Sequence, residues 1–370
     1  SPARALPAGT RSLRVHGGTS PARSAGASGK ISSACHPPDE RVVFHAFPAK
    51  KYLLSPRYTF TMECGESVEQ IVLRPKMTVG ELVAAMGRAG AYNGGALARA
   101  ADIYEAMLRD KAVTRFVGLA GAMVPAGMGR IVSDLIDAGF VDVLVSTGAN
   151  LTHDIIEALG CRHYHGTASC SDVALRDAEI NRIYDVFLPN ESFIRFEEFM
   201  QERFGDLAPQ APLTVRKFLA EVGASLPSGI LASAARNGVP VFCPALADSM
   251  AGLQYWLYTQ THRPILDAFG DMQDLLSLCF SAESAGALLV GGGVPKNYIL
   301  QSMLMTPKGF DYAVQLTGDR PDLGGLSGAT LEEARSWGKI TASARAVTVY
   351  GDATITLPLL VAAVRERLGV

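Results

Sequence analysis

Apolar positions from Thr78 onward recur at two spacings, and their alternation predicts a series of helices and strands. Residues 94–110 carry apolar side chains at helical spacing, and Thr78 with Glu81 forms the capping box typical of a helix start. Strands are predicted at 115–119, 141–147, 184–188, 239–243, 287–290, 312–317 and 346–350, with helices between them and a last helix over 355–368.

Several predicted strands are apolar on both faces, as in Leu288-Leu289-Val290. Strands that are buried on both sides are typical of a parallel sheet covered by helices. The regular alternation of helix and strand therefore predicts an α/β fold with a doubly wound, mostly parallel sheet and helices on both faces, which is a Rossmann-like arrangement. We expect residues 61–370 to form this single domain.

The composition is that of a protein with a sizeable core. Hydrophobic residues make up 48% of the chain, and the mean hydropathy is +0.17. The net charge of −2 gives no indication of a nucleic-acid or membrane-surface partner. The six cysteines contain no CxxC pair, so reduced thiols are favoured over a disulfide framework, and the cytoplasm is the default location.

Residues 1–60 differ from the rest of the chain. Up to Pro38 they contain basic residues but no acidic ones, among many Ser, Ala, Gly and Pro residues. This composition predicts a flexible or transit-like N-terminal extension, so import into an organelle is possible if the host is a eukaryote.

Small and polar residues follow four of the predicted strands, where ligands bind in open α/β sheets. These clusters are 147–150, 291–296, 317–319 and 351–354, and in the first of them Asn150 is the expected helix cap. Glycines at a helix start let backbone N–H groups approach a phosphate, so Gly291-Gly292-Gly293 indicates a nucleotide or phosphorylated cofactor. The run matches neither GxGxxG nor a Walker A loop, and a simple strand-to-helix turn is an equally good interpretation.

Three further features have competing interpretations. The segment from Cys161 to Cys170 contains His163 and His165, but a loop is favoured over a metal site because the spacing matches no common zinc pattern. His153 is more easily explained as a helix-surface residue than as a catalytic one. Asp248 follows a predicted strand, where it would either bond a ribose or cap the next helix.

The segment from Thr330 to Ile340 combines a helix start with a lysine beside an indole. Thr330 and Glu333 form a second capping box, Glu333 and Trp337 lie on one helical face, and Gly338 allows the chain to turn. A lysine such as Lys339, placed beside a carboxylate and a tryptophan, is able to act as an amine nucleophile. By themselves these residues favour an ordinary solvated lysine.

Taken together, these motifs resemble the deoxyhypusine synthase family. The resemblance extends in order from about Thr78 to the C-terminus and is closer to archaeal and bacterial members than to eukaryotic ones. The segments that carry it are 141–147, 181–185, 244–248, 291–296, 333–340 and 350–353.

The resemblance implies an NAD-dependent aminobutyl transferase that takes the 4-aminobutyl group of spermidine. Lys339 would form an imine with this group and pass it to a lysine of the translation factor 5A precursor, while Glu333 and Trp337 would bind the polyamine. The family forms homotetramers with active sites at a dimer interface. It binds NAD at the positions that correspond here to Thr147, Gly148, Asp248, Gly292, Gly293, Asp352 and Ala353.

Four site positions depart from the eukaryotic pattern. Asn297 replaces a histidine of the polyamine site, Leu253 and Leu326 replace two acidic residues that bind spermidine, and His153 replaces a glutamate near the cofactor. Loss of two carboxylates removes partners for a polyamine ammonium. A homospermidine synthase, which would use putrescine or another small amine as acceptor, is therefore the close alternative. A non-catalytic paralogue is a more distant one, because Lys339, Glu333 and Trp337 are all present.

Overall fold

The computed structural model describes residues 66–370, of which Val68–Val370 form one compact unit. The predicted extension over residues 1–60 lies outside the described range. Among the described residues no single helix is long and apolar enough to cross a membrane. One pair of helices within residues 66–370, bent by 101°, passes that test together.

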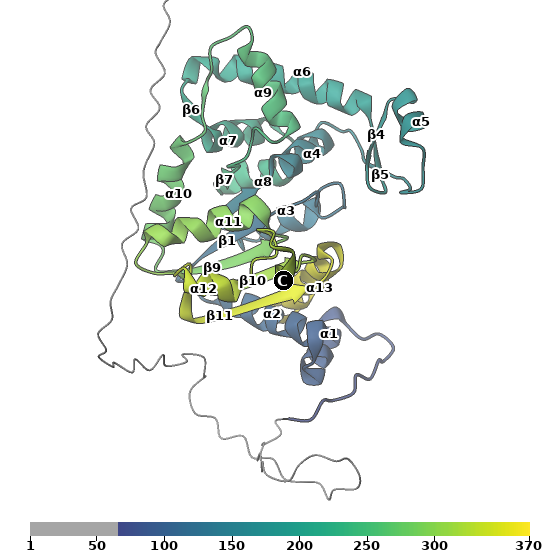
Figure 1. Cartoon of the computed structure of the whole chain (residues 1–370), viewed down its shortest axis with the longest axis vertical. Coiled ribbons are helices and arrows are strands. Elements are labelled where there is room, and N and C mark those ends of the chain that lie inside the picture. Colours follow the sequence, from purple (N-terminus) through teal and green to yellow (C-terminus); the bar gives the residue numbers. More distant parts are fainter. Residues whose placement is uncertain (1–65) are drawn as a thin grey trace, which may run out of the picture. The chain divides into compact units, whose positions relative to one another are not determined.

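A six-stranded, fully parallel sheet forms the centre of the fold (Figure 1). Its spatial order is β11-β10-β9-β1-β2-β7. Numbered along the chain, this is the order 3-2-1-4-5-6 of doubly wound dinucleotide-binding folds, which confirms the predicted fold class. The strands are β1 (Val113–Leu119), β2 (Val143–Ser146), β7 (Val241–Phe242), β9 (Ser284–Val290), β10 (Phe310–Thr317) and β11 (Ile340–Tyr350).

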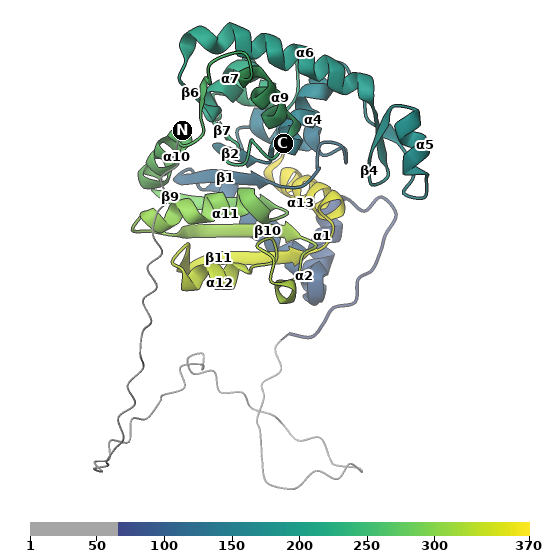
Figure 2. The same cartoon turned by 45° about the horizontal axis from the view of Figure 1, so that its top comes forward.

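Helices cover both faces of the sheet because successive strand residues enter two different apolar cores. Val117 and Val314 face one core, whereas Phe116 and Ala313 face the other. Helices α2 (Tyr92–Arg109), α3 (Gly129–Asp137) and α13 (Ala353–Leu368) cover the first face, and α1 (Val79–Ala89) packs on α2 and α13. Helices α10 (Gly270–Ser281), α11 (Gly293–Ser302) and α12 (Leu331–Ser336) cover the second (Figure 2).

A further group of helices packs beside the β2–β7 edge of the sheet (Figure 1). It consists of α4 (Gly148–Ala158), α6 (Asn190–Leu207), α7 (Val215–Ser225), α8 (Ile230–Asn237) and α9 (Met250–Thr259). Short elements complete the chain: β6 (Leu213–Thr214) pairs with β8 (Leu266–Asp267), and single 3-10 turns lie at Ala208–Gln210, Met303–Met305 and Pro321–Leu323.

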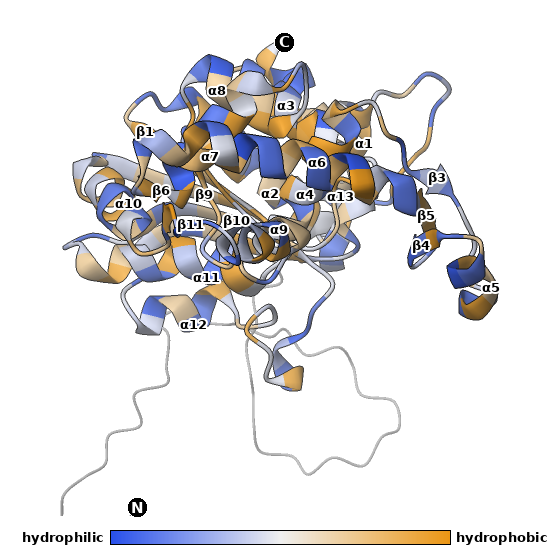
Figure 3. Cartoon of the chain, turned by 90° about the horizontal axis from the view of Figure 1, so that it is seen from above, coloured by the Kyte–Doolittle hydropathy of each residue, from blue (hydrophilic) through white to orange (hydrophobic). Residues whose placement is uncertain are grey.

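The strand predicted at 184–188 exists as β5 (Val186–Pro189) but does not join the main sheet. It pairs antiparallel with β3 (Tyr164–His165) and β4 (Ile180–Ile183), and with α5 (Asp172–Asp177) these strands form a projecting arm (Figure 3). Ile183 pairs with Val186 across a two-residue turn in which Tyr184 has φ 53°. A two-residue hairpin forces antiparallel pairing, and this turn was not recognised in the sequence.

Helix α8 begins at a buried carboxylate on α4. Both oxygens of Asp154 accept backbone N–H bonds, from Ile230 at 2.7 Å and from Leu231 at 2.9 Å. The preceding residue, Gly229, has φ 103° and ψ −176°, and a Cβ there would lie 2.6 Å from Asp154 Oδ1. Only glycine adopts this conformation without strain.

We therefore expect Gly229→Ala to lower the free energy of unfolding by about 2–4 kcal/mol, through backbone strain and displacement of Asp154. Gly205→Ala is the control, because Gly205 lies inside α6 where an added Cβ meets nothing within 4 Å. The control should raise stability by about 0.5–1 kcal/mol. Chemical denaturation measures both, and an equal effect of the two substitutions would contradict the assigned role of Gly229.

Candidate functional site

A crevice opens at the carboxyl edge of the sheet, where the strand order reverses between β1 and β9. It encloses a cavity of about 360 Å³, within the range of small-molecule sites. Loops after five of the six main strands line it. Of the residues that the family resemblance assigned to NAD, the cavity brings together Thr147, Gly148, Asp248, Gly292 and Gly293.

The glycine run forms the turn from β9 into α11. Gly291 and Gly293 have φ of 78° and 59°, so both use the left-handed region. A Cβ on Gly292 would lie 2.5 Å from the Cα of Ser327, so that position has no room for a side chain. The two interpretations of the run are thus compatible: it is a tight turn, and it directs the amino end of α11 into the crevice, where helix N–H groups attract an anion.

Asn150 organises the opposite wall of the crevice. Its fully buried amide accepts bonds from the backbone N–H groups of Met123 at 2.9 Å and Val124 at 3.3 Å, and donates to Leu119 O at 3.3 Å. The prediction that Asn150 caps α4 was wrong, because Thr147 is the cap and its hydroxyl accepts from Asn150 N. An amide three residues into a helix can bond the neighbouring loop instead, and the sequence pattern does not separate these two roles.

The structure excludes the capping interpretation of Asp248. Ser249 caps α9 by accepting from Gly252 N at 3.1 Å, so the carboxylate of Asp248 is not used as a cap and stays exposed at the crevice. Asp352 is a helix cap, since it accepts from Thr354 N at 2.7 Å at the start of α13. Asp352 and Ala353 lie after β11 at the same edge of the sheet but do not line the cavity.

Helix α12 leads into the turn that presents the candidate nucleophile, Lys339. Gly338, with φ 72°, donates to Arg335 O, and Lys339 N donates to Ala334 O, which together form a Schellman motif. Lys339 leaves this turn at the start of β11 with its Nζ 5.4 Å from the centroid of the Trp337 ring. The predicted indole–ammonium contact is therefore present.

One expectation about this segment was wrong. Thr330 accepts from Glu333 N at 3.0 Å, but the Glu333 carboxylate does not return to the Thr330 N–H, so only half of the capping box forms. In this chain Trp337 is 61% exposed and Glu333 is exposed, so the described residues do not enclose a dry pocket around Lys339. Neither Glu333, Trp337 nor Lys339 lines the cofactor-type crevice.

Lys296 is a buried residue that the sequence analysis did not single out. Its side chain lies behind the glycine turn, where Nζ donates to Ser327 O at 3.1 Å and to Ala329 O at 2.7 Å. Burial lowers the pKa of this ammonium to about 8. The neighbouring Asn297 is half-buried and donates to Gln301 Oε1 at 3.2 Å, within its own helix.

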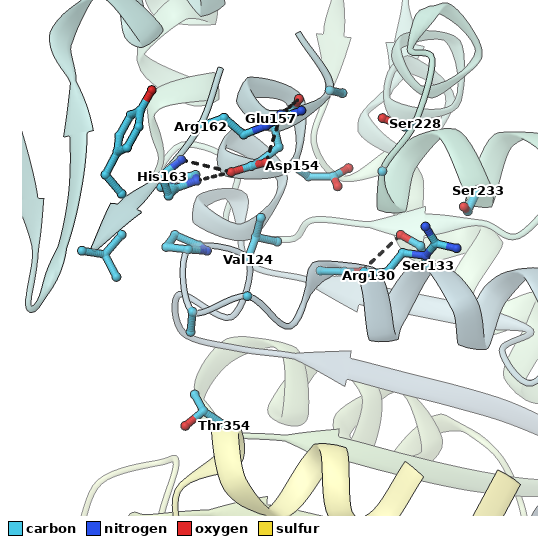
Figure 4. A pocket seen from close by; sticks show the side chains of 18 of the residues that line it. Val124, Arg130, Ser133, Asp154, Glu157, Arg162, His163, Ser228, Ser233 and Thr354 are labelled. Carbon is cyan, nitrogen blue, oxygen red and sulfur yellow. Dashed lines mark hydrogen bonds and ion pairs between the residues drawn. The ribbon is translucent and has the colours of Figure 1, made fainter. Parts of the chain in front are cut away.

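His153 is buried, so its interpretation as a helix-surface histidine was wrong. Its Nδ1 lies 2.9 Å from His163 Nε2, and His163 Nδ1 lies 2.7 Å from Glu157 Oε1. Burial, followed by the charge of His163, lowers the pKa of His153 to about 4. His163 and Glu157 line a second cavity of about 880 Å³ (Figure 4). Within residues 66–370 no three His, Cys, Asp or Glu side chains are arranged to hold a metal ion.

The low pKa of Lys296 predicts a pH dependence of stability. Between pH 8 and 10.5 the unfolded chain holds a proton that the folded chain has released, so stability should rise with pH in this window. The difference between wild type and Lys296→Met should change by up to about 1.4 kcal/mol per pH unit. Denaturation of both proteins across this window measures it, and a constant difference would contradict the lowered pKa.

Comparisons with known proteins identify the family. The family model described as deoxyhypusine synthase matches residues 81–364. "Probable deoxyhypusine synthase 1" of Methanosarcina acetivorans is 57% identical over 296 residues, covering 80% of this chain and 93% of that protein. "Probable deoxyhypusine synthase 1" of Archaeoglobus fulgidus is 47% identical, covering 75% and 91%.

The fold agrees with these comparisons. A crystal structure from Entamoeba histolytica, whose description names deoxyhypusine synthase, superimposes with a TM-score of 0.54 at 16% identity, covering 76% of this chain and 92% of that one. The sequence match, its extent and the doubly wound fold lead to one conclusion: the chain belongs to the deoxyhypusine synthase family and is a deoxyhypusine synthase-like enzyme.

Proposed function

We propose that this enzyme is a deoxyhypusine synthase, which transfers the 4-aminobutyl group of spermidine to a lysine of the translation factor 5A precursor. The observation that carries the proposal is the family match across residues 81–364, within which Lys339 keeps its contact with Trp337 beside Glu333. The family match supports the enzyme class, and the lysine supports the covalent route.

The crevice suits NAD as the cofactor. The amino ends of α4 and α11 lie at the crevice and offer backbone N–H groups to the phosphates. The exposed carboxylate of Asp248 is available to bond a ribose hydroxyl. When bound, NAD would supply the acceptor for the hydride that leaves spermidine and would return it to the product.

Lys339 performs the group transfer in this proposal. Its neutral amine attacks the oxidised aminobutyl carbon, and 1,3-diaminopropane leaves with the electrons of the broken C–N bond. The amine of the acceptor lysine then attacks the same carbon and releases Lys339. Glu333 holds the distal ammonium of the aminobutyl group, and the face of Trp337 stabilises a nearby cation.

A second copy of the chain would complete this site, because Trp337 and Glu333 are exposed in a single chain. The chain also exposes six large apolar side chains on α9 and on or directly before α10, which are Leu253, Trp256, Leu257, Phe269, Met272 and Phe280. We propose a homotetramer with active sites at a dimer interface.

The polyamine site has lost two carboxylates in favour of exposed leucines. Leu253 is 44% exposed and Leu326 is 48% exposed, so neither leucine is part of the core. An apolar rim binds the methylene carbons of a polyamine but leaves its ammonium groups with fewer charged partners. This change affects the affinity for spermidine and the choice of acceptor. The acceptor is therefore tested directly.

In the first test the purified enzyme is incubated with NAD, spermidine and either the 5A precursor or putrescine, and the product is identified by its mass. We expect one aminobutyl group on the 5A precursor, and no product with Lys339→Ala, because the covalent step is lost. Lys308→Met, at an exposed lysine on another loop, serves as the control and should retain activity. Transfer to putrescine alone would identify a homospermidine synthase instead.

The second test concerns assembly. Trp256→Glu places a charge on the exposed apolar surface of α9, so we expect it to shift the protein from tetramer towards smaller species in light scattering. The thermal stability of a separated Trp256→Glu subunit should differ little from that of the wild-type subunit, because Trp256 is 55% exposed in the single chain. A wild-type protein that is monomeric at micromolar concentration would refute the proposed assembly.

A further inference from the structure

Lys296 carries a buried positive charge that no carboxylate among residues 66–370 contacts directly. Its side chain is 4% exposed, and its Nζ bonds are made to two backbone carbonyls, those of Ser327 and Ala329. The charged groups that act on it at longer range are Glu333, Asp319 and Lys339. Burial of an ammonium costs stability unless it is well compensated. A contribution to fold stability therefore does not account for a lysine at this position.

The two carbonyls belong to residues 324–329, which we call the strap. The strap follows the 3-10 turn at Pro321–Leu323 and precedes the Thr330 cap of α12. It lacks regular secondary structure, and Gly328 N donates to Gly325 O at 3.0 Å within it. Two buried side chains hold it from outside, since Gln315 Nε2 donates to Ser327 O at 3.1 Å and Lys296 bonds both Ser327 O and Ala329 O.

The strap connects the two halves of the candidate site. Ser327 lines the crevice and sits against Gly292 in the glycine turn. Ala329 directly precedes Thr330, which is the N-cap of α12. Helix α12 contains Glu333, ends at the Trp337 cap and is followed by Lys339. Lys296 itself stands on α11, one turn after the glycines. Its ammonium therefore joins the helix that faces the crevice to the segment from which α12 begins.

We propose that Lys296 is a positioning residue: its buried ammonium clamps the strap against α11 and so fixes α12 and Lys339 relative to the cofactor crevice. Misplacement of a reacting group by about 1 Å can cost on the order of 10²-fold in rate. A methionine fills similar volume but donates no hydrogen bond, so Lys296→Met should leave the core packed while it removes both bonds from residue 296 to the strap. Ala329 O then loses its side-chain partner, and Ser327 O keeps only the bond from Gln315.

Hydrogen–deuterium exchange tests the clamp without reference to the reaction. Backbone amides of residues 324–333 should exchange at least about ten-fold faster in Lys296→Met than in the wild type, because the strap opens more often. The matched control is Lys308→Met, since Lys308 is an exposed lysine that also donates to a backbone carbonyl, that of Glu283 at 3.0 Å. Unchanged exchange in 324–333 for Lys296→Met would overturn the clamp.

Kinetics test the positioning role, which rests on the proposed function. In Lys296→Met we expect kcat for aminobutyl transfer to fall about 10²-fold with little change in the KM for spermidine. Lys296→Arg, which keeps the charge and the donors, should recover part of kcat, and Lys308→Met should stay within about two-fold of wild type. Faster strap exchange with an unchanged kcat would overturn the positioning role.

The two experiments separate failure of the clamp from failure of the proposed function. If the wild type transfers no aminobutyl group to any acceptor, the proposed function is wrong, while the exchange experiment still decides whether Lys296 holds the strap. If the wild type is active and Lys296→Met is folded, saturable with NAD and slow, the positioning role stands. Loss of NAD binding as the only defect would contradict it.

Discussion

The reversal of strand order between β1 and β9 is the constraint on which the rest of the site depends. Helices leave the two strands in opposite directions, so a crevice must open at their carboxyl ends. The loops that line it come from distant parts of the sequence and are held by buried polar side chains. Asn150 fixes the loop after β1, and Gln315 with Lys296 fixes the strap. Asn150 pairs the backbone N–H groups of Met123 and Val124, and Gln315 and Lys296 share the carbonyl of Ser327.

The candidate nucleophile, Lys339, lies outside this crevice and is positioned by a helix end. Helix α12 lies on the second face of the sheet and ends in a Schellman turn that places Lys339 beside Trp337. The indole of Trp337 is 61% exposed in the single chain. The proposed imine chemistry, however, needs a site from which water is excluded. A single chain thus provides a preformed crevice, whereas the site around Lys339 remains open to solvent. The proposed assembly with a second copy would cover the lysine site and the exposed apolar side chains of α9 and α10.

Much of the architecture was predictable because it depends on local patterns. Apolar runs marked the main strands, and Thr78 with Glu81 forms the full capping box that was expected. The errors arose where a tertiary contact decides the outcome. The β4–β5 hairpin depends on Tyr184 at positive φ, and the amide of Asn150 holds the loop after β1 as well as bonding the Thr147 cap of its own helix. The role of Lys296 depends on the strap, thirty-one residues away in sequence at Ser327, which no local pattern reveals.

The central claim is that Lys339 carries the aminobutyl group, and mass spectrometry of a trapped intermediate tests it most directly. The enzyme is incubated with NAD and spermidine without acceptor, reduced with cyanoborohydride, digested and mapped. We predict one aminobutyl group on the peptide that contains Lys339, formed only when NAD and spermidine are both present. An adduct on another lysine, or transfer to an acceptor with no adduct under any condition, would contradict the account.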